Sequence, residues 1–340
     1  MIQANPSLRL LEKLAPLRAA LRPVPFVKLE CSGIQLYVKM DLFNPIGSIK
    51  DIPALFILQR AVERGEVTPF TTVTESSSGN FALALATYCR FLGLRFVPVI
   101  DPNITAGYEA AIRALCDEVI KVTERDDTGG FLKTRLAAVE RFQRERGDTF
   151  WTNQYGNPDN IMGHYTLTAA GFCEQLPRLD YVFLGVSSGG TIAGVSQRLK
   201  EHFPDVRVVA VDVVGSVIFG GAPAARHIPG IGSSIRPPLV ESARIDEVMH
   251  ISEASTVTAC RELLERHGLF VGGSTGSVYA AILRHLPRLR GAGTPPVVAF
   301  IACDRGAAYV DTIYNPMWCR RIEATEARDG EASAHPTRVA

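Results

Sequence analysis

Short apolar runs alternate with amphipathic segments along most of the chain. The apolar runs, rich in Val, Ile and Phe, predict strands, and the longer segments with one apolar face predict helices. The predicted strands are 27–31, 34–40, 71–75, 95–100, 119–122, 181–186, 206–213 and 296–302. The predicted helices are 7–21, 50–65, 80–91, 108–115, 130–144, 164–176, 190–202, 254–267 and 274–289. This alternation predicts an α/β fold with parallel strands covered by helices on both faces.

Between the predicted strand 206–213 and the next helix lies a Gly- and Pro-rich stretch, residues 215–238. A connection of this length without a helix or strand is uncommon in a compact domain and is usually functional. From residue 323 onward the chain is polar and rich in small residues, which predicts a frayed tail over 323–340.

Composition and charge exclude several classes of protein. The chain has 340 residues and 46% hydrophobic composition, enough for two cores, and its formal net charge is only +1. No strong field therefore attracts nucleic acid or a membrane surface, and no apolar run approaches the roughly 20 residues that span a bilayer. The seven cysteines are odd in number and never stand in a C-x-x-C pair. This pattern argues against a disulfide framework and against a zinc site. We expect a cytoplasmic protein without a metal, a signal peptide or a membrane segment.

A single lysine, Lys50, stands at the start of a predicted helix and at the end of the turn Asn44–Asp51. Apolar or small residues flank it, so burial and the helix N-terminus should both lower its pKa. An amine with a lowered pKa is a nucleophile that forms a Schiff base with an aldehyde cofactor. The alternative is a solvated surface lysine, which is the more common role of a lysine at a helix start.

Four loops follow predicted strands and open helices, where ligands of open α/β sheets gather. Residues 75–80 place three serines before a helix, more than an N-cap needs, and predict an anion site. Residues 187–191, Ser-Ser-Gly-Gly-Thr, resemble a phosphate cradle, although they lack the P-loop lysine and G-x-G-x-x-G, and a positive-φ turn is the alternative. Residues 272–277 place a serine at the start of another predicted helix. In residues 304–306, Asp304 either closes the site from its edge or caps a helix.

The order of these loops resembles the fold-type II pyridoxal-phosphate enzymes. Asn44–Asp51 is similar to the N-P-x-G-S-x-K-D segment of cysteine synthases, and 77–80 to their T-S-G-N loop. Residues 272–276 are similar to their G-I-S-S-G loop and 153–158 to their Q-F-x-N-P segment. Gly221 with 227–232 follows their G-G…H-x-I-x-G-I-G pattern. The resemblance covers about residues 8–312.

Departures from plain cysteine synthases indicate a branch of this family. Phe81 and Ala82 follow the asparagine loop, Tyr155 replaces a phenylalanine, and the ending 304–315 reads D-R-G-A-A-Y-V-D-T-I-Y-N. These features resemble the N-(2-amino-2-carboxyethyl)-L-glutamate synthases of 2,3-diaminopropionate and staphyloferrin B biosynthesis. That branch joins O-phospho-L-serine to L-glutamate and releases phosphate, and the resemblance implies a PLP-dependent transferase with these substrates.

The resemblance also implies the architecture. It predicts two open, twisted, mostly parallel sheets covered by helices, as in the tryptophan synthase β chain. Residues 1–40 and 150–322 are expected to form the larger cofactor-binding domain, and 41–149 a smaller mobile domain that closes over the substrate. The family implies a homodimer.

The motifs that resemble the family also imply which residues form the site. The resemblance implies that Lys50 binds pyridoxal phosphate covalently and moves the Cα proton, while Asn80 contacts the phenolic oxygen of the ring. Residues implied to bind the phosphate and the ring nitrogen are Ser187, Ser188, Gly189, Gly190, Thr191 and Ser274. Residues implied to bind the substrate carboxylate are Ser77, Ser78 and Gln154, with Tyr155, Arg236 and Arg226 as candidates for the carboxylates of glutamate. Surface charge is the alternative for both arginines.

The sequence is also compatible with other functions. A cysteine synthase using O-acetylserine or O-phosphoserine with sulfide would need almost no pocket for its nucleophile. A serine or threonine dehydratase is weaker because the regulatory C-terminal domain is missing. An inactive cofactor-binding scaffold is the non-enzyme alternative, against which the intact lysine and asparagine loops argue. A Rossmann dehydrogenase is disfavoured because no G-x-G-x-x-G follows the first strand.

Overall fold

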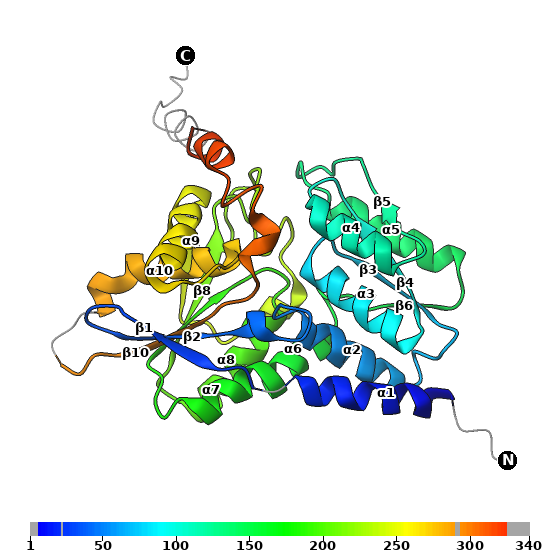
Figure 1. Ribbon diagram of the computed structural model, residues 1–340, viewed down its shortest axis with the longest axis horizontal. Helices are drawn as coiled ribbons and strands as arrows, with labels where there is room; N and C mark the ends of the chain where they lie inside the picture. Colours follow the sequence, from blue (N-terminus) through cyan, green and yellow to red (C-terminus); the bar gives the residue numbers. More distant parts are fainter. Residues whose placement is uncertain (1–5, 22, 290–292, 325–340) are drawn as a thin grey trace.

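Two open sheets, each covered by helices, make up the structure, a computed structural model that describes residues 6–21, 23–289 and 293–324 (Figure 1). The larger sheet has the order β1 (Phe26–Leu29), β2 (Gln35–Lys39), β10 (Val297–Ile301), β7 (Tyr181–Gly185), β8 (Arg207–Val213), β9 (Glu247–Ile251). The smaller sheet has the order β5 (Ile120–Lys121), β4 (Arg95–Ile100), β3 (Thr72–Ser76), β6 (Thr149–Trp151). Only β1 and β2 pair antiparallel, and every other pair is parallel. The α/β fold with mostly parallel sheets is therefore confirmed.

Two pairs of helices cover the larger sheet, and alternate residues of β10 face them. Val298 and Phe300 pack into the apolar cluster of α9 and α10, whereas Ala299 and Ile301 pack into the cluster of α7 and α8. Successive strand residues point to opposite faces, and both faces are buried here, so the strand reads as one continuous apolar run. The helices span Ala169–Gln175 (α7), Gly190–His202 (α8), Glu253–His267 (α9) and Gly273–Leu289 (α10).

The smaller sheet is covered by helices α1 to α5. Leu10 and Leu14 of α1 pack into the apolar cluster that α2 and α3 form over this sheet. Strand β6 pairs with β3, so residues 150 and 151 also belong to the smaller sheet. The two-domain division stays a prediction, but these contacts place α1 and β6 on the other side of its boundaries. The helices span Pro6–Ala20 (α1), Asp51–Glu63 (α2), Asn80–Leu92 (α3), Ala106–Leu115 (α4) and Leu132–Glu145 (α5).

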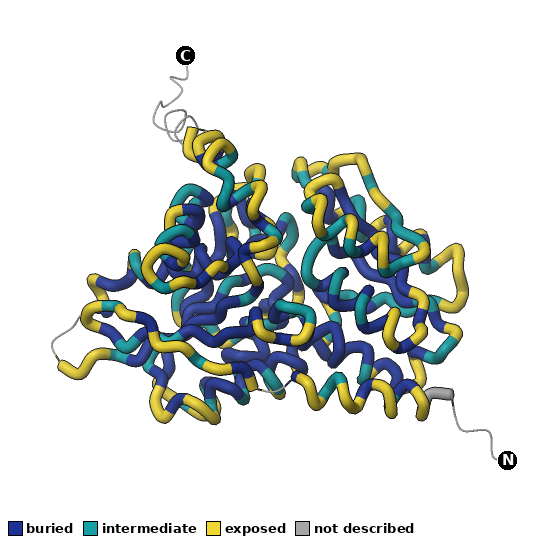
Figure 2. The backbone as a smooth tube through the Cα atoms, viewed as in Figure 1, coloured by how far each residue is buried: buried dark blue, intermediate teal, exposed yellow. Residues whose placement is uncertain are grey.

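A continuous helical segment joins the two halves of the chain. It consists of α6 (Pro158–Gly163), the π-helix η2 (His164–Thr168) and α7. The sequence predicts its start at residue 164, but the side chain of Asn157 caps α6 and Pro158 occupies the first turn, so the helix begins at Pro158. Figure 2 shows buried residues concentrated along both sheets and along the helices between them.

The remaining differences from the predicted elements lie at the ends and edges. Strands β6 and β9 were not predicted, and residues 316–324 form a helix that includes residues 323 and 324 of the predicted tail. The rest of that tail, 325–340, lies outside the described residues. The short helices are η1 (Asp41–Phe43), η3 (Pro238–Ser242) and η4 (Gly306–Tyr309). As predicted, the stretch 215–237 contains no helix or strand. None of the described helices is long and apolar enough to cross a membrane.

Close packing of α8 against the segment α6–η2 yields a test of the fold. A Cβ on Gly194 would lie 2.3 Å from the carbonyl oxygen of Ile161 and 2.6 Å from the backbone nitrogen of Tyr165. We expect Gly194→Ala to lower the free energy of unfolding by about 1–3 kcal/mol, because backbone cannot move aside cheaply. Urea denaturation measures the change.

The matched control for this prediction is Gly107→Ala in α4. A Cβ on Gly107 would meet no atom within 4 Å. This variant should be unchanged or up to about 1 kcal/mol more stable, because alanine favours the helix. Equal stabilities of the two variants would contradict the packing argument.

Candidate active site

The site lies where the carboxyl ends of strands from both sheets meet the start of α2. Residues 77–79 follow β3, residues 187–189 follow β7, and Cys303 with Asp304 follow β10. The loop before α2 is joined to this edge, since the Ile49 N–H donates to the Cys303 carbonyl at 2.8 Å. A further bridge pairs Ser48 with Asp304. Lys50, as the residue preceding α2, is thereby placed between the two sheets.

The loop that carries Lys50 is held by its own buried side chains. Asp51 accepts the backbone N–H of Ile46 at 2.6 Å and the hydroxyl of Ser48 at 3.3 Å. The Asn44 amide donates to the Ser48 carbonyl at 3.1 Å, and Gly47 has a φ of 107°, a conformation that favours glycine. Burial raises the pKa of Asp51 to about 6, although these donors oppose the shift. The backbone around Lys50 therefore has little freedom.

Lys50 lies at the junction of two cavities. The larger, of about 350 Å³, is lined by the serine loop, Gln154 and Tyr155, and by residues 224–234. The smaller, of about 60 Å³, lies under the residues that the resemblance assigns to the cofactor. Lys50, Asn80 and Ser187 line both cavities. A group bound covalently to Lys50 would therefore face both spaces.

The smaller cavity brings together almost all of the predicted cofactor residues. Its walls include Lys50, Asn80, Ser187, Ser188, Gly189, Thr191 and Ser274. Gly190 is absent from the walls, but a Cβ there would lie 2.1 Å from Asn160 Oδ1, so only glycine fits. Gly189 has a φ of 91°. An amine, hydroxyl groups and the N-terminus of α8 form a donor set that fits a phosphorylated aldehyde.

Burial governs the charge of Lys50. Desolvation lowers the pKa of Lys50, and negative charge on Cys303, Asp304 and Glu75 would oppose that shift. Burial also raises the pKa of Cys303 to about 12, so this thiol is neutral near pH 7 and adds no anion. Lys50 forms no ion pair with any carboxylate of the described residues, which keeps its neutral, nucleophilic form accessible.

The serine loop differs in detail from the prediction. The Ser78 hydroxyl donates to Asp101 Oδ2 at 3.0 Å and accepts from Arg135 at 3.1 Å, so it is already committed. The Ser77 hydroxyl has no hydrogen-bond partner among the described residues and lines the larger cavity. Gln154 lines the same cavity, and its amide donates to the Ser76 carbonyl at 3.2 Å. Ser77 and Gln154 are therefore the side chains still free to meet a carboxylate.

A fully buried carboxylate, Glu75, lies behind this loop. It accepts the backbone N–H of Ser76 at 2.8 Å, the backbone N–H of Gln154 at 3.2 Å and the hydroxyl of Thr152. It thus connects the serine loop to the Gln154 segment. Burial raises the pKa of Glu75 to about 7, although these three donors oppose the shift.

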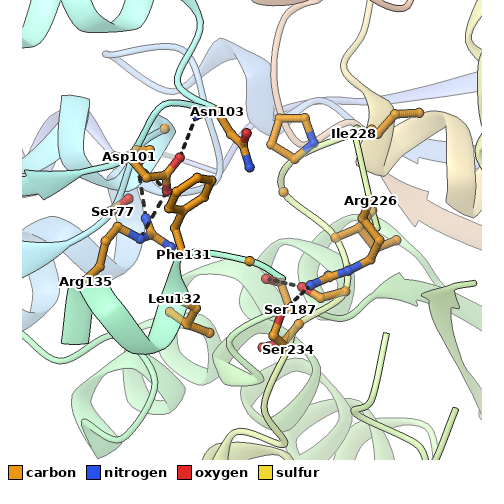
Figure 3. A pocket seen from close by; sticks show the side chains of 18 of the residues that line it. Ser77, Asp101, Asn103, Phe131, Leu132, Arg135, Ser187, Arg226, Ile228 and Ser234 are labelled. Carbon is orange, nitrogen blue, oxygen red and sulfur yellow. Dashed lines mark hydrogen bonds and ion pairs between the residues drawn. The ribbon is translucent and has the colours of Figure 1, made fainter. Parts of the chain in front are cut away.

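The positions of the arginines in the fold decide which of them can meet a ligand. Arg236 is exposed and lines neither of these two cavities. Arg226, Arg125 and Arg135 do line the larger cavity. Arg135 lies on a predicted helix, and only the fold reveals that this helix faces the site. Figure 3 shows Arg226 and Arg135 on opposite sides of the cavity.

The two arginines of Figure 3 differ in how far their charge is compensated. Arg135 pairs with Asp101 at 3.2 Å, whereas Arg226 donates to Ser234 Oγ at 2.9 Å and has no carboxylate partner within the described ranges. Its Nε atom is buried without a hydrogen bond. Burial raises the pKa of Tyr155, and the positive charges of Arg135 and Arg226 oppose that shift. The wall near Arg226 therefore suits an anionic ligand.

A lysine at the junction of these cavities, beside a helix N-terminus rich in hydroxyls, fits a pyridoxal-phosphate enzyme. The profile of the family "Pyridoxal-phosphate dependent enzyme" matches residues 17–304, and the chain belongs to this family. The enzyme therefore uses pyridoxal phosphate as its cofactor.

Two curated relatives that share one name match most of this chain. The chain is 43% identical over 294 residues, 86% of each chain, to an N-(2-amino-2-carboxyethyl)-L-glutamate synthase of Cupriavidus metallidurans. It is 41% identical over 304 residues, 89% of each chain, to a protein of the same name from Ralstonia nicotianae. Among solved structures, the O-acetylserine dependent cystathionine beta-synthase of Helicobacter pylori matches with a TM-score of 0.81 and 27% identity. That match covers 93% of this chain and 100% of the other.

Glu75 gives a prediction about stability and pH. The pKa of Glu75 is raised to about 7 in the folded state. Stability linked to this proton is therefore full below the unfolded pKa near 4.5 and is lost as pH rises through about 7. Between about pH 5 and pH 8, wild type should lose on the order of 3 kcal/mol relative to Glu75→Gln, measured by urea denaturation.

The control for this pH dependence is Glu124→Gln, because Glu124 is exposed. Its stability should follow that of wild type at every pH. If Glu75→Gln loses as much stability as wild type over the same interval, Glu75 does not take up the proton.

Proposed function

We propose that this enzyme joins O-phospho-L-serine and L-glutamate by β-replacement, giving N-(2-amino-2-carboxyethyl)-L-glutamate and phosphate for 2,3-diaminopropionate and siderophore biosynthesis. The observation that carries the proposal is Arg226, a largely buried cation that lines the larger cavity with Lys50 and forms no direct ion pair among the described residues. The names of the two curated relatives support the same reaction.

The residues of the site divide the work of the reaction. When bound, pyridoxal phosphate withdraws electrons from the amino-acid substrate and acidifies its Cα–H bond. The Lys50 amine, with its pKa lowered by burial, takes and returns the Cα proton. Ser77 and Gln154 bind the substrate carboxylate near the N-terminus of α3. Ser274 offers the ring nitrogen a neutral partner, which favours β-elimination over transamination.

The larger cavity suits an amino-acid nucleophile. Its volume of about 350 Å³ exceeds what sulfide needs, and its walls carry Arg226 and Tyr155. Glutamate brings two carboxylates, each of which needs a cation or hydroxyl to replace its hydration. Arg226 serves one of these carboxylates and the Tyr155 hydroxyl serves the other.

A cysteine synthase is the second candidate. The structural likeness to an O-acetylserine dependent enzyme favours it, because that activity uses a related leaving group. The serine loop, Lys50 and Asn80 would serve it equally well. Only the wall around Arg226 distinguishes the two, and so the second substrate must be tested directly.

We also propose that the active form is a cytoplasmic homodimer, as the resemblance to cysteine synthases implies. Light scattering coupled to size-exclusion chromatography measures the mass of the holoenzyme. A mass of one chain at catalytic concentration would contradict the dimer.

Ordered additions to the holoenzyme test the reaction. O-phosphoserine should change the visible absorption band of the cofactor and release phosphate, and glutamate should then restore the band and give the joined product by mass spectrometry. Sulfide goes into a parallel cuvette. If sulfide alone restores the band, the enzyme is a cysteine synthase. The Lys50→Ala variant should show no band and lose turnover by more than about a thousandfold, whereas exposed Lys28→Ala should be unaffected.

Arg226→Met tests the glutamate site. Removing the cation should raise the KM for glutamate about ten- to a hundredfold, because a charge-assisted hydrogen bond is lost. The band change on adding O-phosphoserine should stay as in wild type. Arg236→Met is the matched control, since Arg236 is exposed outside the cavity and its loss should change neither step. An unchanged KM in Arg226→Met would remove Arg226 from the site.

A further inference from the structure

A chain of four hydrogen-bonded side chains connects the two sheets across the site. The Asn80 amide nitrogen donates to Asp304 Oδ2 at 2.7 Å, and the Tyr309 hydroxyl donates to the same oxygen at 2.5 Å. On the other side, the Tyr108 hydroxyl donates to Asn80 Oδ1. Asn80 and Tyr108 belong to α3 and α4 on the smaller sheet, whereas Asp304 and Tyr309 follow β10 of the larger sheet.

The chemistry of its neighbours sets which way the Asn80 amide points. Asp304 Oδ2 can only accept from the amide, so the NH₂ group must face it. Burial raises the pKa of Tyr108, which therefore stays protonated and donates to the amide oxygen. The reversed amide would bring its oxygen to the Asp304 oxygen and its nitrogen to the Tyr108 donor. The Asp304 contact therefore selects this orientation, and the Tyr108 hydroxyl, which can donate or accept, completes it by donating to the amide oxygen.

This orientation leaves one amide hydrogen of Asn80 for a ligand. The nitrogen carries two hydrogens, and only one is used by Asp304. Asn80 lines both cavities beside Lys50. The free hydrogen suits an oxygen acceptor attached to the cofactor ring.

The space for the Asp304 carboxylate is kept open by a glycine. A Cβ on Gly272 would lie 2.1 Å from Asp304 Oδ1 and 2.6 Å from a ring carbon of Tyr309. Asp304 is 3% exposed. A buried carboxylate is costly unless hydrogen-bonded, so its partners Asn80 and Tyr309 stabilise it as much as it orients them.

We propose that Asp304 and Tyr108 are positioning residues that hold the Asn80 amide with its nitrogen toward the cofactor, and that this orientation requires contact between the two sheets. The pair acts on the cofactor through Asn80, although Tyr108 also lines the larger cavity and Asp304 the smaller one. The inference rests on the cofactor of the family and is independent of which nucleophile the enzyme uses.

A double-mutant cycle on the cofactor site tests the inference without turnover. Asp304→Ala and Tyr108→Phe should each weaken binding of pyridoxal phosphate to the apoenzyme about tenfold and shift the absorption maximum of the holoenzyme. In an Asn80→Ala background the same changes should be less than about twofold, because the group through which they act is gone. Asp311→Ala, an exposed residue of the same segment, is the control and should match wild type.

Two results would overturn the inference. One is a wild-type absorption maximum and affinity in both single variants. The other is an effect of equal size with and without Asn80, which would mean that the residues act elsewhere. If Asp304→Ala does not fold, as judged by circular dichroism, the Tyr108→Phe cycle decides alone, since it removes one hydroxyl from a half-buried ring. Failure of glutamate as a substrate would leave these readouts unchanged, so the two proposals fail separately.

Discussion

The structure depends on holding one partly buried lysine amine without an ion-pair partner among the described residues. Desolvation lowers the pKa of Lys50, and this effect outweighs the negative charges nearby. An uncompensated buried amine persists only if the backbone that carries it cannot turn it toward solvent. The loop before α2 provides this restraint through the hydrogen bonds of Asp51 and Asn44 and through the bond from Ile49 to Cys303. The reactivity of the lysine therefore depends on the rigidity of its loop.

Buried carboxylates surround the amine without pairing with it. Burial raises the pKa values of Asp51, Glu75 and Asp304, and each accepts hydrogen bonds from groups other than Lys50. Glu75 holds the serine loop and the Gln154 segment, Asp51 holds the lysine loop, and Asp304 holds Asn80. Partial protonation of Asp51 and Glu75 near pH 7 limits how strongly these two attract the Lys50 proton. The same acids thus fix geometry and leave the amine free.

Much of this arrangement follows from the sequence, because both faces of the central strands are covered. Buried parallel strands appear as apolar runs, and the loops that follow them carry the serines, glycines and the lysine. The edge strand β9 escaped prediction because its residues are only partly buried, and β6 because three residues carry too little pattern. Arg135 and Tyr108 lie on helices whose inward faces only the packing reveals. Ser78 looked free in the motif, yet Asp101 and Arg135, distant in sequence, occupy its hydroxyl.

Arg135 and Arg226 are residues of the same type, but different neighbours in the larger cavity give them different electrostatic environments. Arg135 and Arg226 both face this space, but Asp101 forms an ion pair with the first, whereas the second forms none among the described residues and feels Asp212 and Glu253 only at longer range. A guanidinium that is partly desolvated and lacks an anion gains most from a ligand that brings one. Arg226 reaches this space from the stretch 215–237, which contains no helix or strand, so loop contacts such as the bond to Ser234 set its position.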